Sequence, residues 1–298
     1  MARTRDIFVG LVIGGVFLLF VFLIGFSIWG ITHRSQDFSF IPSGDKIAIV
    51  KVEGVIEGSE DIIRQLRKYD KDNSVRAIVL RINSPGGAVA PTEEIYEYVK
   101  RVRDNGTYVI ASLSSIAASG GYYIACACDT IVTNKGTLVG SIGVILSYMT
   151  FEGLMDKVGV QLEVVKSGEL KDVGNYSREM TQKEREMLQA TLDDTYNQFV
   201  LAVAEDRNME MMAVEEIADG SIFTGNQALA LGLVDKIGGF EDAISLAGTM
   251  TGLGENPDTI REIPRRRTIY DYLVENLFSD LNMVVPSTVR PRLEYLYK

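Results

Sequence analysis

Apolar and polar positions divide the chain into one uninterrupted apolar run, a short polar stretch and a long region in which two periodicities alternate. Residues 7–31 carry no charged side chain, and Ser27 is their one polar side chain. As a helix rising about 1.5 Å per residue, this run is long enough to cross a hydrocarbon core of about 30 Å. It exceeds the roughly 7–15 apolar residues of a cleaved signal peptide. The pattern predicts an uncleaved signal anchor over residues 1–34, with a transmembrane helix over 7–31.

The charges that flank this run predict its orientation. Arg3 and Arg5 precede it, and His33 and Arg34 follow it. Together with the amino terminus, the leading charges favour a cytoplasmic N-terminus and an extracytoplasmic domain at a cell membrane. Residues 35–45 (SQDFSFIPSGD) are polar and contain Pro and Gly, so they are interpreted as a linker.

Beyond the linker, strand and helix patterns alternate over residues 46–260. Runs rich in β-branched residues predict strands over 46–56, 75–82, 108–113, 129–133 and 162–165, and apolar residues at helical spacing predict helices over 59–70 and 92–103. Strands alternating with helices of about 10–15 residues indicate an α/β fold with a mainly parallel sheet.

A further helix is predicted to start at Thr181. Thr181 and Glu184 match a capping box, and apolar residues follow at three- and four-residue spacing. We expect this helix to pack on the sheet or in a subunit contact.

The last part of the chain, residues 261–298, forms a separate amphipathic segment. After Pro264 and a basic triplet, apolar residues recur every four positions from Ile269 to Leu281. The predicted helix could cover a core edge, join subunits or lie at the membrane surface.

The amino-acid composition excludes several kinds of catalytic and binding site. The single histidine is His33, so no imidazole is available to the folded domain and no histidine-based triad or HExxH zinc site can be built there. The formal net charge of −10 argues against a nucleic-acid surface. Cys126 and Cys128 are expected to be buried and unpaired. We expect no metal and no cofactor.

Three segments combine glycine, serine and lysine next to predicted strands. Residues 83–87 (NSPGG) form a turn whose N–H groups could hold a developing oxyanion, or a plain tight turn. Residues 117–123 (AASGGYY) open an apolar helix, where Ser119 is either a nucleophile or an N-cap. Residues 166–172 (KSGELKD) offer lysines that burial could turn into bases, or that could simply lie at the surface.

Taken in order with residues 140–144 (GSIGV), these segments resemble the S49 family, the signal peptide peptidase A group. The resemblance covers roughly residues 45–245 and continues through residues 223–228 and 232–235. It implies a Clp-protease/crotonase-like fold of repeated ββα units. Clp proteases use a Ser-His-Asp triad, from which this chain is separated by its lysine segment and its lack of histidine.

The resemblance also implies the roles of individual residues. Ser119 is then the nucleophile and Lys171 the general base, with Lys166 as the alternative. The N–H groups of Gly86 and Gly120 would form the oxyanion hole, with Gly87 as a substitute. Ser141 would orient the lysine amine. Near Ser221 the family usually carries a basic residue or histidine that this chain lacks, which leaves substrate contacts there open.

The implied function is a membrane-anchored serine endopeptidase that degrades cleaved signal peptides and other apolar peptides. Bacterial relatives of double length carry two such domains, whereas this chain has one, and the family commonly forms rings of eight subunits. Three alternatives stand beside this reading. They are a crotonase-like acyl-CoA enzyme, a membrane-anchored scaffold that has lost catalysis, and a membrane-integrated protease partner from the same clan, although only one span is visible in the sequence.

Overall fold

The computed structural model describes residues 14, 18–20, 22, 44–262 and 292–297. The predicted transmembrane helix over 7–31, apart from the few positions just named, and the predicted amphipathic helix over 269–281 lie outside these residues. In the part of the chain that is described, no helix combines the length and apolar character needed to span a membrane. The domain belongs to one compact unit that starts at Gly44.

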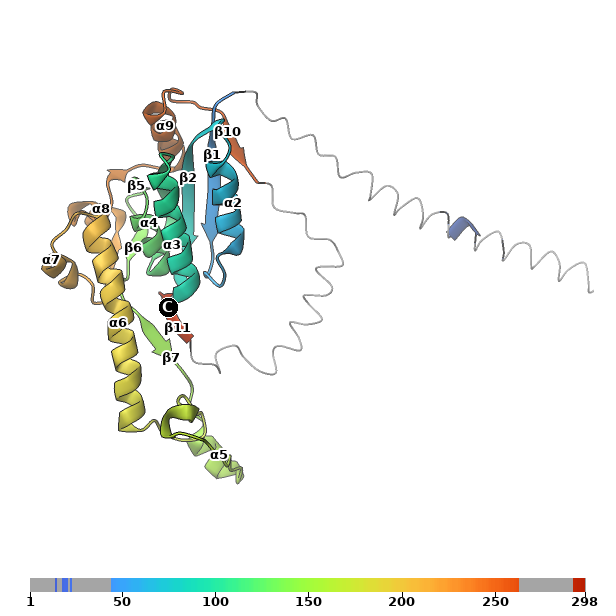
Figure 1. Cartoon of the computed structure of the whole chain (residues 1–298), viewed down its shortest axis with the longest axis vertical. Helices are drawn as coiled ribbons and strands as arrows, with labels where there is room; N and C mark the ends of the chain where they lie inside the picture. The colour runs from blue at the N-terminus through green and yellow to red at the C-terminus, as the bar shows by residue number, and fades with distance from the viewer. Residues whose placement is uncertain (1–13, 15–17, 21, 23–43, 263–291, 298) are drawn as a thin grey trace, which may run out of the picture. The chain divides into compact units, whose positions relative to one another are not determined.

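A mixed sheet forms the centre of the domain (Figure 1). Its main path runs β10-β1-β2-β4-β5-β9, and β6 and β8 extend it beside β4. All pairings in this sheet are parallel except the one between β6 and β8. The bounds of its strands are β1 Lys46–Glu53, β2 Val75–Ser84, β4 Tyr108–Ala118, β5 Thr130–Thr133, β6 Leu138–Gly140, β8 Ile222–Thr224, β9 Lys236–Ile237 and β10 Thr259–Arg261.

Helices cover both faces of this sheet, with α9 on one face and α2, α3, α4 and α6 on the other. The bounds of the described helices are α2 Glu60–Asp70, α3 Val89–Asp104, α4 Gly120–Cys126, α5 Glu152–Val158, the 3-10 helix η1 Glu169–Asp172, α6 Gln182–Asp206, α7 Met211–Glu215, α8 Gly225–Ala230 and α9 Phe240–Met250. Alternate residues of the central strands point to opposite faces. In β2, Ile78 and Leu80 join the large core with α2, α3, α4 and α6, whereas Ala77 and Val79 face α9.

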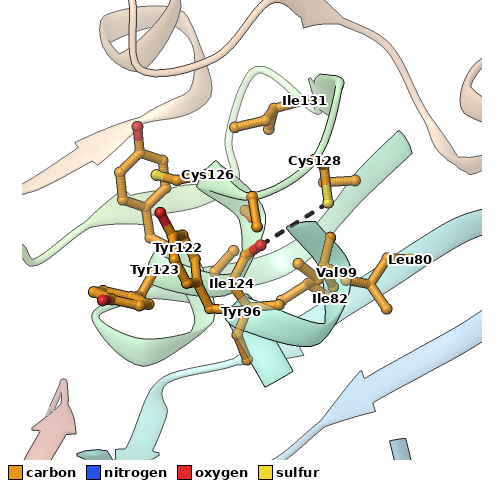
Figure 2. Close-up of a cluster of buried hydrophobic side chains, with 14 of the residues drawn as sticks. Leu80, Ile82, Tyr96, Val99, Tyr122, Tyr123, Ile124, Cys126, Cys128 and Ile131 are labelled. Carbon is orange, nitrogen blue, oxygen red and sulfur yellow. Dashed lines mark hydrogen bonds between the residues drawn. The ribbon is translucent and has the colours of Figure 1, made fainter. Parts of the chain in front are cut away.

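The helix α4 lies wholly inside the large core. Figure 2 shows its aromatic residues, Tyr122 and Tyr123, among side chains from the neighbouring strands and from α3. The Tyr122 hydroxyl donates to the carbonyl of Leu233 at 2.8 Å, which satisfies its one polar group. Cys126 and Cys128 are buried and unpaired, as predicted. This packing fixes the helix that starts directly after Ser119.

A second, small sheet lies beside the first. It has the order β3-β11-β7, with β3 at Gly86–Ala88, β7 at Ile145–Ser147 and β11 at Arg292–Leu296. The last strand pairs antiparallel with both of its neighbours. This strand brings the end of the chain back to the region of Gly86.

Most of the predicted elements are confirmed, and one is wrong. The strand β1, the strand β2 and the helix α3 lie where the pattern indicated, and α6 begins with the predicted capping box at Thr181. The predicted strand over 162–165 is absent, since this stretch has no regular structure and its side chains are exposed. β-branched residues need a neighbouring strand to form a ladder, and none pairs with this stretch among the described residues.

Candidate active site

Three strand ends bring the predicted site residues together. The parallel strands β2, β4 and β6 end at Ser84, Ala118 and Gly140, and the register pairs Ser84 with Ala117 and Ala118 with Gly140. Carboxyl ends of neighbouring parallel strands meet at one edge of a sheet, which is where α/β folds bind ligands. The segments that carry Gly86, Ser119 and Ser141 therefore lie side by side.

The backbone of Ser119 is strained. Its φ of 52° and ψ of −120° differ from those of an ordinary helix start, and its side chain makes no capping hydrogen bond. Ser119 therefore stands at the N-cap position of α4, but its side chain does not cap the helix. The strain is held by flanking backbone bonds, because the N–H of Ser119 donates to the carbonyl of Gly140 at 2.7 Å and its carbonyl accepts from Tyr123 at 2.8 Å. A serine on a sharp strand-to-helix turn is typical of a hydrolase nucleophile.

The Ser119 hydroxyl has one weak partner. It donates to the carbonyl of Gly143 at 3.5 Å, and the residue is 1% exposed. No titratable side chain among the described residues hydrogen-bonds to it. A general base for Ser119 would therefore have to be a residue that does not contact its hydroxyl in this structure.

The two glycine turns approach each other closely. A Cβ added to Gly86, whose φ is +99°, would lie 2.7 Å from the nitrogen of Gly120, and one added to Gly120 would lie 3.2 Å from the Cα of Gly86. Only glycine fits at such a contact. The N–H of Gly86 donates to the Ser84 hydroxyl at 3.1 Å. The roles of Gly86 and Gly120 as oxyanion donors stay predictions, with Gly87 as the substitute.

Lys171 lies in η1. This helix and α5 belong to the segment between β7 and α6, which we call the extension (Figure 1). Its side chain is exposed, and its Nζ makes no hydrogen bond or ion pair with any described residue. The structure does not connect Lys171 to Ser119 within the described part of the chain. The pairing of the two residues stays a prediction.

Lys166, the alternative base, is already engaged. Its Nζ donates to the carbonyl of Glu169 at 2.8 Å and to Oδ1 of Asp172 at 2.5 Å. These two contacts hold the Lys166 amine within its own segment. The choice of Lys171 over Lys166 as the base stays a prediction.

Arg178 connects η1 to the start of α6. Its guanidinium contacts the carboxylates of Asp172 and Glu184. Hydrogen bonds from Arg178 and Lys166 lower the pKa of Asp172 well below its usual range, and Arg178 lowers that of Glu184 to about 2. This network, which sequence reasoning missed, fixes the segment that carries Lys171.

Ser141, the predicted lysine-orienting residue, also has an unusual backbone. Its φ is 50°, and its N–H donates to the carbonyl of Ser221 at 2.7 Å. The described non-glycine residues with positive φ are Ser119, Ser141 and Asn208. Two of these three, Ser119 and Ser141, are predicted site residues. Among the described residues, no contact joins Ser141 to Lys171.

Sequence reasoning also missed β11, which pairs beside Gly86. Its signal is a short alternation of apolar and polar letters in residues 292–297 (RLEYLY). A run this short gives no indication of its partner strands.

Two protein-family models match the chain, and both agree with the fold described above. The model of peptidase family S49 matches residues 101–253, just over half of the chain, and the model of Clp protease matches residues 45–134. The second match supports a Clp-protease-like α/β fold with a mixed sheet.

Individual relatives of the chain also bear the names of proteases or peptidases. "Putative protease slr0021" of Synechocystis is 42% identical over 245 residues, which are 80% of this chain and 88% of the relative. "Putative signal peptide peptidase SppA" of Enterococcus faecium is 37% identical over 68% of this chain and 62% of its own length. "Protease 4" of Haemophilus influenzae is 34% identical over 82% of this chain but only 39% of its own length.

The contact between the glycine turns can be tested with Gly86→Ala. Its Cβ would collide with the nitrogen of Gly120, so we expect kcat for an apolar peptide to fall more than about tenfold, as on loss of an oxyanion donor. Gly106→Ala is the matched control, because Gly106 also has a positive φ of +91° but open space around its Cβ. Both variants should lose about 1 kcal/mol of stability from the backbone alone. An unchanged kcat in Gly86→Ala would contradict the predicted oxyanion hole.

The pKa of Glu184 predicts a pH-dependent stability. Its folded pKa of about 2 lies below the usual 4.5, so its carboxylate stabilises the fold above pH 4.5, and this contribution is lost as pH falls toward 2. Glu184→Gln should lower the free energy of unfolding by about 2 kcal/mol at neutral pH. In urea titrations the difference from wild type should shrink on acidification. Glu205→Gln, exposed on the same helix, should show no such difference, and a constant deficit in Glu184→Gln would rule out the ionic contribution.

Proposed function

Because the chain belongs to peptidase family S49 and is a serine peptidase, we propose that it is a membrane-anchored endopeptidase with a Ser119–Lys171 dyad. The observation that carries the proposal is the strained, buried Ser119 at the end of β4, beside the contact between Gly86 and Gly120. A nucleophile beside backbone donors is the arrangement that acyl transfer requires.

The mechanism follows from these groups. Neutral Lys171 accepts the hydroxyl proton as Ser119 Oγ attacks the peptide carbonyl, and backbone N–H groups of the glycine turns hold the oxyanion. The ammonium of Lys171 then protonates the leaving amine. Water, deprotonated by the same lysine, hydrolyses the ester.

The proposed substrates are cleaved signal peptides and other apolar, membrane-derived peptides. A relative from Enterococcus faecium bears the name of a signal peptide peptidase, which supports this substrate class. The apolar residues 7–31 would anchor the chain at the cell membrane with its N-terminus in the cytoplasm. The catalytic domain would then lie outside the cytoplasm, next to peptides left in the membrane.

We further infer that a second copy of the chain supplies Lys171. Within one chain the lysine is exposed and lacks a described partner, whereas Ser119 is buried. The same extension exposes a set of large apolar side chains: Met149, Leu154, Val158, Val160, Leu162, Val164 and Val165. Exposed apolar patches of this kind are typical of protein interfaces. A ring, of eight subunits as the family suggests, would bury this patch and bring each lysine to a neighbouring serine.

The dyad is tested by single substitutions in the full chain. Ser119→Ala and Lys171→Ala should each reduce hydrolysis of an apolar peptide by at least about a thousandfold, because nucleophile and base act as a unit. Lys236→Ala, at an exposed lysine on β9 outside this patch, should leave activity unchanged. Activity that survives both substitutions would contradict the mechanism. Binding of coenzyme A would indicate a crotonase-like enzyme, and wild-type protein without turnover would indicate a scaffold.

Mixing the two inactive variants tests where the lysine comes from. In a random ring of Ser119→Ala and Lys171→Ala subunits, about a quarter of the neighbouring pairs combine a native serine with a native lysine. We therefore expect activity to return to about that fraction of wild type after the two proteins are dissociated and reassembled together. No recovery, in mixed rings demonstrated by native mass spectrometry, would mean that serine and lysine come from the same chain.

A further inference from the structure

A buried serine hydroxyl, that of Ser84, joins the glycine turn to the end of β1. Ser84 is the last residue of β2 and is fully buried. Its hydroxyl donates to the carbonyl of Gly54 at 2.6 Å and accepts from the N–H of Gly86 at 3.1 Å. Gly54 follows β1 directly. One oxygen atom thus bridges two backbone turns that follow neighbouring strands.

Backbone hydrogen bonds join the same two turns on either side of this bridge. The N–H of Gly54 donates to the carbonyl of Asn83 at 3.0 Å, and the N–H of Ile56 donates to the carbonyl of Gly86 at 2.9 Å. Between Asn83 and Gly86 the chain passes through Pro85, which has no N–H to donate. The serine hydroxyl therefore links the turns at a point where the proline cannot.

Ser84 also lies against the first turn of α4. A Cβ added to Gly121 would lie 2.7 Å from the carbonyl oxygen of Ser84 and 3.3 Å from its Cβ. In the sheet, Ser84 pairs in register with Ala117, two residues before Ser119. The residue is thus packed between the glycine turn and the helix that begins directly after the proposed nucleophile.

The hydrogen bond from Gly86 sets the direction of a predicted oxyanion donor. The N–H of Gly86 points at the Ser84 hydroxyl, which fixes the peptide unit between Pro85 and Gly86. Two glycines in succession have no Cβ and a wide range of backbone conformations, so hydrogen bonds have to hold them in one. Gly87, the substitute donor, follows directly, and its N–H depends on how Gly86 is held.

We propose that Ser84 is a positioning residue of the peptidase site, which holds the glycine turn so that its N–H groups align with the oxyanion formed at Ser119. The proposal rests on the proposed peptidase function and deepens it with a residue that acts through the backbone of Gly86. Donors that are already aligned stabilise an oxyanion better than donors that must reorient during the reaction. Loss of the bridge therefore weakens binding of the transition state and leaves binding of the peptide substrate almost unchanged.

Replacing Ser84 by alanine in the full chain tests this role by steady-state kinetics. Ser84→Ala removes one oxygen atom and adds no bulk. We expect kcat for an apolar peptide to fall about ten- to a hundredfold, with KM changed less than about twofold, because small misplacements of catalytic groups act on the chemical step. Ser112→Ala is the matched control and should keep the wild-type kcat. Ser112 is a serine of β4, 1% exposed, whose hydroxyl accepts from Arg81 at 2.9 Å.

Unfolding in urea separates positioning from a general loss of stability. Ser84→Ala and Ser112→Ala should both lower the urea midpoint, since each loses a buried hydrogen bond. Ser84→Cys keeps a weak donor of similar size and should have a kcat between those of wild type and Ser84→Ala. An unchanged kcat in Ser84→Ala, or an equal fall in Ser112→Ala, would overturn the proposal. If Ser84→Ala does not fold, Ser84→Cys takes its place in the same comparison.

A fluorophosphonate probe gives a readout that needs no peptide turnover. Ser119 Oγ attacks phosphorus, fluoride leaves, the hydroxyl proton passes to the base, and a phosphoryl oxygen takes the place of the oxyanion. The rate of labelling should fall about tenfold or more in Ser84→Ala. In chains that also carry Ser119→Ala, the affinity for a fluorescent apolar peptide should be the same with and without Ser84→Ala. Weaker peptide binding with an unchanged labelling rate would contradict the proposal.

Failure of the proposed peptidase function would have a different signature. It would appear in the absence of any Ser84 substitution, as turnover by Ser119→Ala or as wild-type protein that neither turns over peptide nor reacts with the probe. The second of these results would remove the present proposal as well. A wild-type chain that is active and labelled, together with an equally active Ser84→Ala chain, would overturn the role of Ser84 alone.

Discussion

The geometry of the site depends on the parallel pairing of β2 with β4, two strands buried on both faces of the sheet. This pairing brings the turn after Ser84 against the turn after Ala118, so that a Cβ on Gly86 would lie 2.7 Å from the nitrogen of Gly120. The helix α4 is held in place by its packing in the core, so Ser119 adopts its strained backbone at the junction between β4 and α4. The fold around Ser119 maintains this strain.

The ion pairs around η1 leave Lys171 outside their network. Asp172 and Glu184 both pair with Arg178, and Asp172 also pairs with Lys166. Lys171, between these groups in sequence, has no described carboxylate partner. Because the one histidine of the sequence is His33, we propose that Lys171, which has no partner among the described residues, supplies the base that Ser119 lacks within a single subunit.

Sequence patterns predicted the helices and strands that are determined by neighbouring residues in the sequence. The capping box at Thr181 and the apolar spacing after it define α6, and the β-branched run over 75–82 defines β2. Residues 162–165 have the same composition as a strand but no strand to pair with, so there the prediction was wrong. Short strands such as β7 and β11 depend on partners far away in the sequence, which is why their pattern alone could not reveal them. The positions of Ser119 and the glycine turns at strand ends could be predicted, while their catalytic roles stay predictions. The network around Arg178 forms only in the folded chain.

Ser119 is proposed to be the nucleophile of a peptidase whose one histidine, His33, precedes the folded domain. Peptide mapping by mass spectrometry, after treatment of the full chain with a phosphonylating probe, tests it most directly. We predict one adduct per chain, on Ser119, and its loss when Lys171 is replaced by alanine. No adduct on Ser119, or an adduct on a different serine, would contradict the account.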